Sequence, residues 1–160
     1  LINKWVTLNK GDVQIIQSGS GISHSETISE NASIFQIWFD PDLGKSLQEK
    51  PQYKDYLSIF FKSNGTKKNI IGKKSPVKLI SEKIKIFELD LSNDYLLEDM
   101  LGNYLSIYVL YGVINFGKLK AIENDFIKIY NEKNIKINIE SPCKLFCISS
   151  PLQVSYKTYI

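Results

Sequence analysis

Short apolar runs that alternate with polar residues constrain the fold of this chain more than any other feature. Isoleucine occupies every second position from 135 to 139, with Lys and Asn between, and the run from 84 to 91 begins in the same way. Side chains of a β-strand point to opposite faces in turn, so this period of two indicates strands with one face on a core.

Similar runs follow one another along the second half of the chain, and turn-forming residues separate them. They lie at 77–80, 84–91, 104–110, 113–116, 126–130, 135–139 and 145–148. The composition agrees, since 23 Ile, nine Tyr and eight Phe stand against two Ala. We therefore predict an all-β sandwich, jelly roll or barrel. Its core is expected to include Ile86, Leu89, Ile107, Val109, Ile127, Ile137 and Phe146.

The first half of the chain is less regular. We predict a strand–turn–strand over 6–16 and a strand over 33–39, with residues 45–56 as an extended connection. From 62 to 78 there are six Lys and no acidic residue, which fits either a solvated loop or a phosphate-binding patch. The loop is the favoured interpretation, and it sets a boundary: one unit at 1–61, a linker at 62–75 and a second unit at 76–160.

Charge and cysteine usage narrow the possible partners and the compartment. The chain has 20 Lys, no Arg and a net charge of only +3, which argues against direct recognition of nucleic acid. No apolar run approaches the roughly 20 residues of a membrane helix, so no membrane contact is expected.

Cys143 and Cys147 would lie about 13 Å apart on one strand, too far for a disulfide. We expect two buried, reduced thiols and a cytoplasmic protein.

One pair of residues carries chemistry. His24 is the only histidine, and Glu26 follows two positions later. On a strand, both side chains would point to one side and could bind the same metal ion, while Gly19 and Gly21 would let backbone pass nearby. A histidine–glutamate pair also arises by chance, and a lone histidine is usually structural. The pair alone therefore does not establish a metal site.

The wider pattern is more specific. Four strings of this sequence resemble motifs of the pirin family of bicupins. They are G-D-V-Q at 11–14, S-G-S-G-I-S-H-S-E at 18–26, F-Q-I-W-F at 35–39 and P-Q-Y at 51–53. Residues 76–151 are similar to the second cupin of bacterial pirin-like proteins in the order and spacing of strands. The resemblance implies a cupin fold, with part of an N-terminal cupin followed by a complete C-terminal cupin that binds no metal.

Pirins hold one mononuclear metal, usually iron, through three histidines and one glutamate. The resemblance assigns His24 and Glu26 to two of those ligands, with Glu26 also as the catalytic base and Fe(II) as the expected ion. The other two histidines belong to an H-x-H strand that the family places farther upstream than the 23 residues before His24 allow. We therefore expect either a fragment or a gene that has lost its beginning, and weak metal binding by this chain alone.

Three functions remain open at this point. The resemblance implies a quercetin 2,3-dioxygenase-like oxygenase that acts on a small aromatic, flavonol-like substrate, with Gln36 and Trp38 on a strand that lines the cavity, although Trp38 could equally be plain core. The alternatives are a metal- or redox-dependent regulatory or binding protein, with the lysine-rich run as its contact surface, and an inactive remnant. The intact protein is expected to be a monomer.

Overall fold

The computed structural model describes residues 4–159, and it confirms the all-β prediction. The strands are β1 (Val13–Gln17), β2 (Gln52–Tyr56), β3 (Lys67–Ile71), β4 (Lys85–Leu91), β5 (Tyr95–Leu97), β6 (Asn103–Phe116), β7 (Leu119–Ala121), β8 (Phe126–Tyr130) and β9 (Ile135–Pro151). Helical structure in this part of the chain is limited to α1 (Leu43–Ser46) and a 3₁₀ turn, η1 (Ser58–Phe60). Neither is long or apolar enough to cross a membrane.

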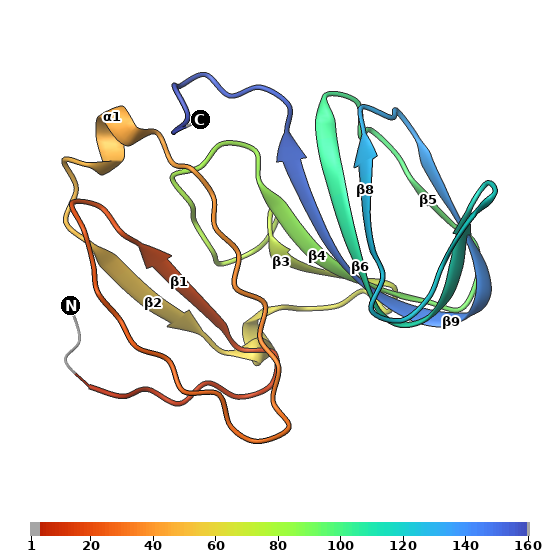
Figure 1. The fold of residues 1–160 in the computed structure, drawn as a ribbon, viewed down its shortest axis with the longest axis horizontal. Helices are drawn as coiled ribbons and strands as arrows, with labels where there is room; N and C mark the ends of the chain where they lie inside the picture. The colour runs from red at the N-terminus through yellow and green to blue at the C-terminus, as the bar shows by residue number, and fades with distance from the viewer. Residues whose placement is uncertain (1–3, 160) are drawn as a thin grey trace.

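Most strands belong to one antiparallel sheet that curls into a barrel (Figure 1). The order is β3-β4-β9-β6-β7, with β8 also paired to β6 and β5 to β9. The two long strands β6 and β9 bend where their register shifts between Val109 and Ile114. Gly112 lies in this bend at φ +92°, where an added Cβ would stand 2.4 Å from the Cβ of Cys143. This glycine therefore lets the two strands approach closely enough to turn the sheet.

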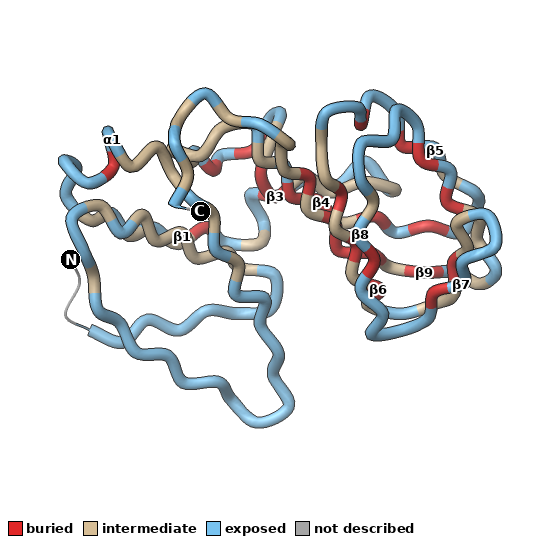
Figure 2. Tube along the Cα trace, turned by 45° about the horizontal axis from the view of Figure 1, so that its top comes forward, coloured by how far each residue is buried: buried red, intermediate tan, exposed pale blue. Residues whose placement is uncertain are grey.

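The barrel interior is an apolar core, visible as the concentration of buried residues around β4, β6 and β9 in Figure 2. All seven predicted core residues are buried. Ile86 and Phe146, however, belong to a second cluster on the outer face of the sheet. The reason is strand parity, because each is adjacent in sequence to a residue that faces the interior, Phe87 and Leu145 respectively.

The outer cluster joins the first part of the chain, residues 4–61, to the barrel. Val13 and Ile15 of β1 pack against it. The ring of Phe35 stacks on that of Phe146, with centroids 4.3 Å apart and planes 10° from parallel. The first part of the chain is therefore attached through side-chain packing and hydrogen bonds, such as that from the N–H of Ile80 to Gln17 Oε1, rather than through a shared sheet.

The first part contains less regular structure than the sequence predicts. β1 and β2 form a two-stranded antiparallel sheet of their own, so the predicted connection at 45–56 includes a strand. The strands predicted over 6–9 and 33–39 are absent from the described residues, and so is a strand at 22–26. These segments have no neighbouring strand among residues 4–159 to complete their backbone hydrogen bonds, which explains why their apolar alternation does not produce a sheet.

The lysine-rich run is only partly a loop, since its residues 67–71 form β3 and pair with β4. Lys68 Nζ lies 3.7 Å from Glu88 Oε2 on the outer face. Lys67 points to the inner face, with Nζ 3.8 Å from the centroid of the Phe87 ring. The loop interpretation is therefore wrong for these residues, while the division into units at 1–61 and 76–160 stays a prediction.

The two cysteines are free and buried, which confirms that they do not form a disulfide. Both side chains face the barrel interior, where Cys147 lies opposite Phe87 on β4 and Ile107 on β6. Burial raises the pKa of Cys143 to about 11 and that of Cys147 further. Both groups are therefore neutral thiols that act as small apolar side chains.

Candidate functional site

His24 and Glu26 lie close together. His24 Nε2 is 3.6 Å from Glu26 Oε1, so the two side chains come close enough to share one ion, as expected. The segment is not a strand, however, and about a third of each side chain is exposed. The imidazole and the carboxylate thus lie together although the strand from which their proximity was expected is absent.

The loop before this pair is fixed by two glycines. Gly19 has φ +52°, and an added Cβ there would lie 2.4 Å from the carbonyl oxygen of Glu49. The N–H of Ser20 donates to that same carbonyl at 3.0 Å, and the N–H of Gly21 donates to the carbonyl of Ser18 at 2.8 Å. The loop therefore packs directly against the chain entering β2, and only glycine at position 19 allows this contact.

The pair fits part of a metal site. Two ligand atoms, each about 2.1 Å from one ion, are roughly 3 to 4 Å apart, which matches the observed 3.6 Å. An imidazole nitrogen and a carboxylate oxygen suit a divalent transition metal. Within residues 4–159, no group of three or more His, Cys, Asp or Glu side chains is placed to hold an ion. Among the described residues, His24 and Glu26 could therefore supply two donors to an ion, without a third His, Cys, Asp or Glu beside them.

A second polar group lies on the β1–β2 sheet. Gln14 Nε2 donates to the Tyr53 hydroxyl at 2.9 Å, and Asp55 is the direct partner of Gln14 across the two strands. Burial is the larger cause that raises the pKa of Tyr53, and a hydrogen bond with Asp55 is the smaller one. Asp55 Oδ1 is buried without a hydrogen-bonding partner. These side chains lie on the opposite face of the ribbon from Val13 and Ile15, because side chains alternate along the strands.

Sequence reasoning identified Gln14 and Tyr53 only as parts of a recurring pattern and gave them no role. Asp55 was missed altogether. The signal that could have found it is the spacing of two between Tyr53 and Asp55, which is the same i, i+2 rule that paired His24 with Glu26.

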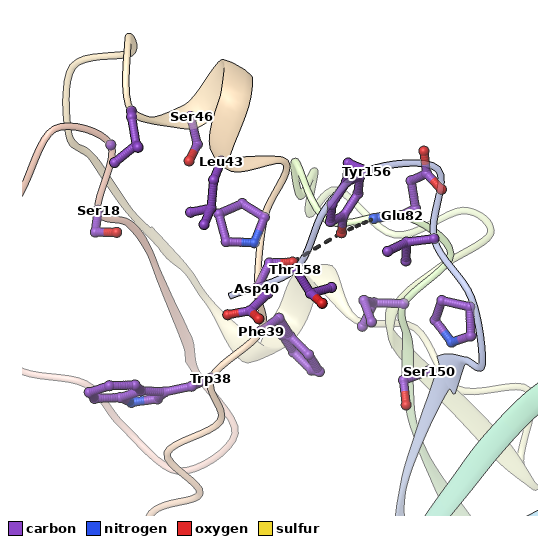
Figure 3. Close-up of a pocket in the computed structure, with 16 residues that line it drawn as sticks. Ser18, Trp38, Phe39, Asp40, Leu43, Ser46, Glu82, Ser150, Tyr156 and Thr158 are labelled. Atoms are coloured by element: carbon purple, nitrogen blue, oxygen red, sulfur yellow. Dashed lines mark hydrogen bonds between the residues drawn. The ribbon is translucent and has the colours of Figure 1, made fainter. Parts of the chain in front are cut away.

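Gln36 and Trp38 do not line a barrel interior. Both are exposed, and the Trp38 side chain is 85% accessible, so the interpretation of Trp38 as core is wrong. Trp38 instead borders an open cavity of about 560 Å³ between the first part of the chain and the C-terminal tail (Figure 3). The cavity wall includes Ser18, Phe39, Asp40, Pro41, Leu43, Glu82, Ile84, Val154 and Tyr156.

The C-terminal tail holds one side of this cavity in place. The Tyr156 hydroxyl donates to the carbonyl of Asp40 at 3.0 Å and accepts from the N–H of Glu82 at 3.3 Å (Figure 3). Ser155 donates through both its N–H and its hydroxyl to the Glu82 carboxylate, which lowers the pKa of Glu82. His24 and Glu26 are not among the residues that line this cavity.

Comparison with known proteins identifies the fold. A Geobacillus kaustophilus protein of known structure superposes with a TM-score of 0.71 at 19% identity, over 93% of this chain and 67% of the other. The quercetin 2,3-dioxygenase of Acinetobacter baumannii gives 0.58 at 16% identity, over 75% and 46%. The bacterial pirin of Escherichia coli in complex with nickel(II) gives 0.54 at 16% identity, over 65% and 45%.

The chain has a cupin fold. It spans about half the length of the dioxygenase and of the Escherichia coli pirin. No family model matches the sequence, and no curated protein matches it. The structural neighbours thus support a relationship to pirins and cupins at the level of fold.

Proposed function

We propose that this chain is a pirin-like cupin metalloprotein in which His24 and Glu26 are two ligands of a mononuclear divalent metal, with Fe(II) as the ion. The observation that carries the proposal is the 3.6 Å separation of His24 Nε2 and Glu26 Oε1. The nickel(II) complex of the structurally similar Escherichia coli pirin supports it. Since His24 is the only histidine of the chain, the remaining ligands implied by the pirin resemblance cannot be histidines of this sequence.

The reaction we propose is dioxygenation of a small aromatic, flavonol-like substrate, as the name of the Acinetobacter baumannii neighbour suggests. A bound metal would supply Lewis acidity and a site for oxygen. Glu26 would accept the proton of the substrate hydroxyl on a carboxylate oxygen, which makes the substrate more electron-rich. About a third of its side chain is exposed, so the carboxylate is accessible to a substrate. The proposed compartment is the cytoplasm.

The first test is metal binding by the chain itself, measured by titration with Ni(II) under calorimetry. We expect one weak site per chain, because only two ligands are present. His24→Ala should abolish it and Glu26→Gln should weaken it, whereas Ser23→Ala, at the neighbouring exposed position, should leave it unchanged. Retention of the site in His24→Ala would overturn the metal assignment.

The second test is oxygen uptake with quercetin. We expect turnover only where the metal site is filled, and we expect Glu26→Gln to reduce the maximal rate more than it reduces metal content. Stoichiometric metal without oxygen uptake would contradict the oxygenase and favour a metal-dependent binding protein. That second candidate has its own support, because large apolar side chains such as Trp5, Ile59 and Phe60 are exposed on the first part of the chain.

A further inference from the structure

Asp40 is held in place by hydrogen bonds, but no cation neutralises its charge. Its carbonyl oxygen accepts hydrogen bonds from the Tyr156 hydroxyl at 3.0 Å and from the Ser81 hydroxyl at 3.1 Å. Its carboxylate oxygen Oδ2 accepts a hydrogen bond from the N–H of Tyr159 at 2.9 Å. None of the ion pairs formed among residues 4–159 includes Asp40. Because all three donors are neutral, the negative charge of this carboxylate stays without a compensating positive charge.

Trp38 lies on the same side of its segment as Asp40. Ile37 and Phe39 are partly buried against the outer cluster, whereas Trp38 and Asp40 are exposed. Side chains that alternate in burial in this way point to two opposite sides of the chain. Figure 3 shows Phe39 and Trp38 projecting in opposite directions. The Trp38 side chain, which is 85% exposed, therefore presents an aromatic surface on the side that carries the carboxylate.

Both side chains line the cavity of about 560 Å³ between the first part of the chain and the C-terminal tail (Figure 3). Small-molecule sites have volumes of about 300–1,000 Å³, so the cavity is large enough for a small organic ligand. Its charged lining residues are Asp40 and Glu82, and no lysine lines it. Much of the remaining wall is apolar, formed by Phe39, Pro41, Leu43, Leu47, Ile84 and Val154. The cavity thus offers contact with hydrocarbon together with negative charge.

Glu82 is the second carboxylate of this wall, and it is less available than Asp40. It accepts hydrogen bonds from both the N–H and the hydroxyl of Ser155, which lower its pKa. The positive charges of Lys83 and Lys45 lower the pKa of Glu82 by smaller amounts. Part of the negative charge of Glu82 is therefore already offset, and Asp40 is the carboxylate that remains for a cationic ligand.

We propose that this cavity binds a small protonated organic amine, whose ammonium group lies between the Asp40 carboxylate and the face of the Trp38 ring. The carboxylate attracts the cation by its charge, and the ring attracts it through the negative potential of its face. The hydrocarbon body of the ligand rests on the apolar wall. A metal ion is disfavoured, because residues 4–159 contain no group of three or more His, Cys, Asp or Glu side chains placed to hold one. His24 and Glu26 do not line this cavity, so the proposal does not depend on their role.

The amine 2-phenylethylamine and its neutral isostere 2-phenylethanol test this site on the full chain. Trp5→Phe leaves Trp38 as the only tryptophan, so its fluorescence reports binding beside it. We expect a saturable change with the amine, at least about fivefold weaker binding of the alcohol, and weaker amine binding as salt rises. Equal affinity for the amine and the alcohol would overturn the proposal, and so would the absence of saturable amine binding. Binding of 3-phenylpropanoate as tightly as the amine would also overturn it.

Single substitutions locate the ammonium group, with binding measured by calorimetry. Asp40→Asn keeps an oxygen that can accept the Tyr159 N–H, and it should weaken the amine about fivefold without changing the affinity for the alcohol. Trp38→Leu should weaken the amine about three- to tenfold, and this exposed position keeps the test valid if Asp40→Asn fails to fold. Glu123→Gln is the matched control, because Glu123 is exposed between β7 and β8 and does not line the cavity. Amine affinity that is unchanged in both Asp40→Asn and Trp38→Leu, or equally weakened in Glu123→Gln, would overturn the proposal.

Discussion

The two parts of this molecule begin from similar residues and end in different structures. In the barrel, Leu89, Ile107 and Ile137 are fully buried, and every central strand has neighbours on both sides. In the first part, Trp5, Trp38 and Ile59 are more than two-thirds exposed, and only β1 and β2 pair. The contrast shows that apolar alternation produces a strand only where another strand is available to accept its backbone hydrogen bonds.

The two parts also differ in what they contribute: one supplies most of the stability and the other the candidate metal ligands. The barrel holds the apolar core, while the proposed metal ligands occur in the irregular segment at 22–26. A substitution at His24 or Glu26 is therefore expected to leave the folding of the barrel unchanged. The predictions below test this contrast, beginning with the largest expected effect.

Removing apolar volume should affect the two parts very differently. Leu89→Ala creates a cavity in the barrel core and should lower the free energy of unfolding by about 2–5 kcal/mol. Ile59→Ala, at a position 72% exposed, should lower it by less than about 0.5 kcal/mol. Urea denaturation followed by circular dichroism measures both values. Equal losses would show that the Ile59 side chain is buried in solution.

Two glycines with nearly the same φ allow the effect of backbone strain to be measured apart from that of close packing. Gly112 and Gly65 have φ of +92° and +94°, but an added Cβ meets Cys143 at 2.4 Å in the first case and nothing within 4 Å in the second. Gly112→Ala should therefore cost about 2–4 kcal/mol, from strain plus overpacking, and Gly65→Ala about 1 kcal/mol, from strain alone. Similar losses in urea denaturation would mean that the β6 bend relaxes around the extra methyl group.

Alkaline pH should weaken the barrel through its thiols. In the folded state the pKa of Cys143 is raised from 9.0 to about 11, so the unfolded chain loses this proton first. Stability is then complete below pH 9 and falls as the pH rises toward 11, by up to about 2–3 kcal/mol. Cys143→Ala should reduce this slope in urea denaturation at pH 8, 9 and 10. An unchanged slope would assign the alkaline loss to other groups.

The contact between the two parts is expected to contribute least. Phe35 and Phe146 stack with centroids 4.3 Å apart. A double-mutant cycle with Phe35→Leu and Phe146→Leu should give a coupling free energy of about 0.5–1.5 kcal/mol. A coupling near zero would show that the stacked arrangement does not persist in solution and that the first part is held by other contacts of the outer cluster.

Much of the barrel could be predicted from local pattern. The runs at 84–91 and 126–130 became β4 and β8, and the predicted core residues are buried. The closeness of His24 and Glu26 was expected as well, although the strand from which it was argued is absent. Strand β3 could not be predicted, because its lysines suggest a loop. Lys67 and Lys68 are accommodated in this strand, with one ammonium over the Phe87 ring and the other beside Glu88, while Ile70 and Ile71 bury the end of the strand.

The sequence by itself determined the all-β class, the period of the barrel strands and the i, i+2 proximity of the candidate ligands, since each depends on residues a few positions apart. Tertiary structure alone decided which side of the sheet each residue faces. Alternation predicts that every second residue of a strand faces the core, but it does not say which of the two sets does so when both are apolar. Strand β4 is such a case, because it buries residues on both faces. Tertiary structure also decided the contact of Gln14 with Tyr53, which are 39 positions apart, and the pairing of Lys85 with Ser149, which are 64 positions apart. Such pairs exist only after the strands find their register, and register is set by the packing of the whole sheet.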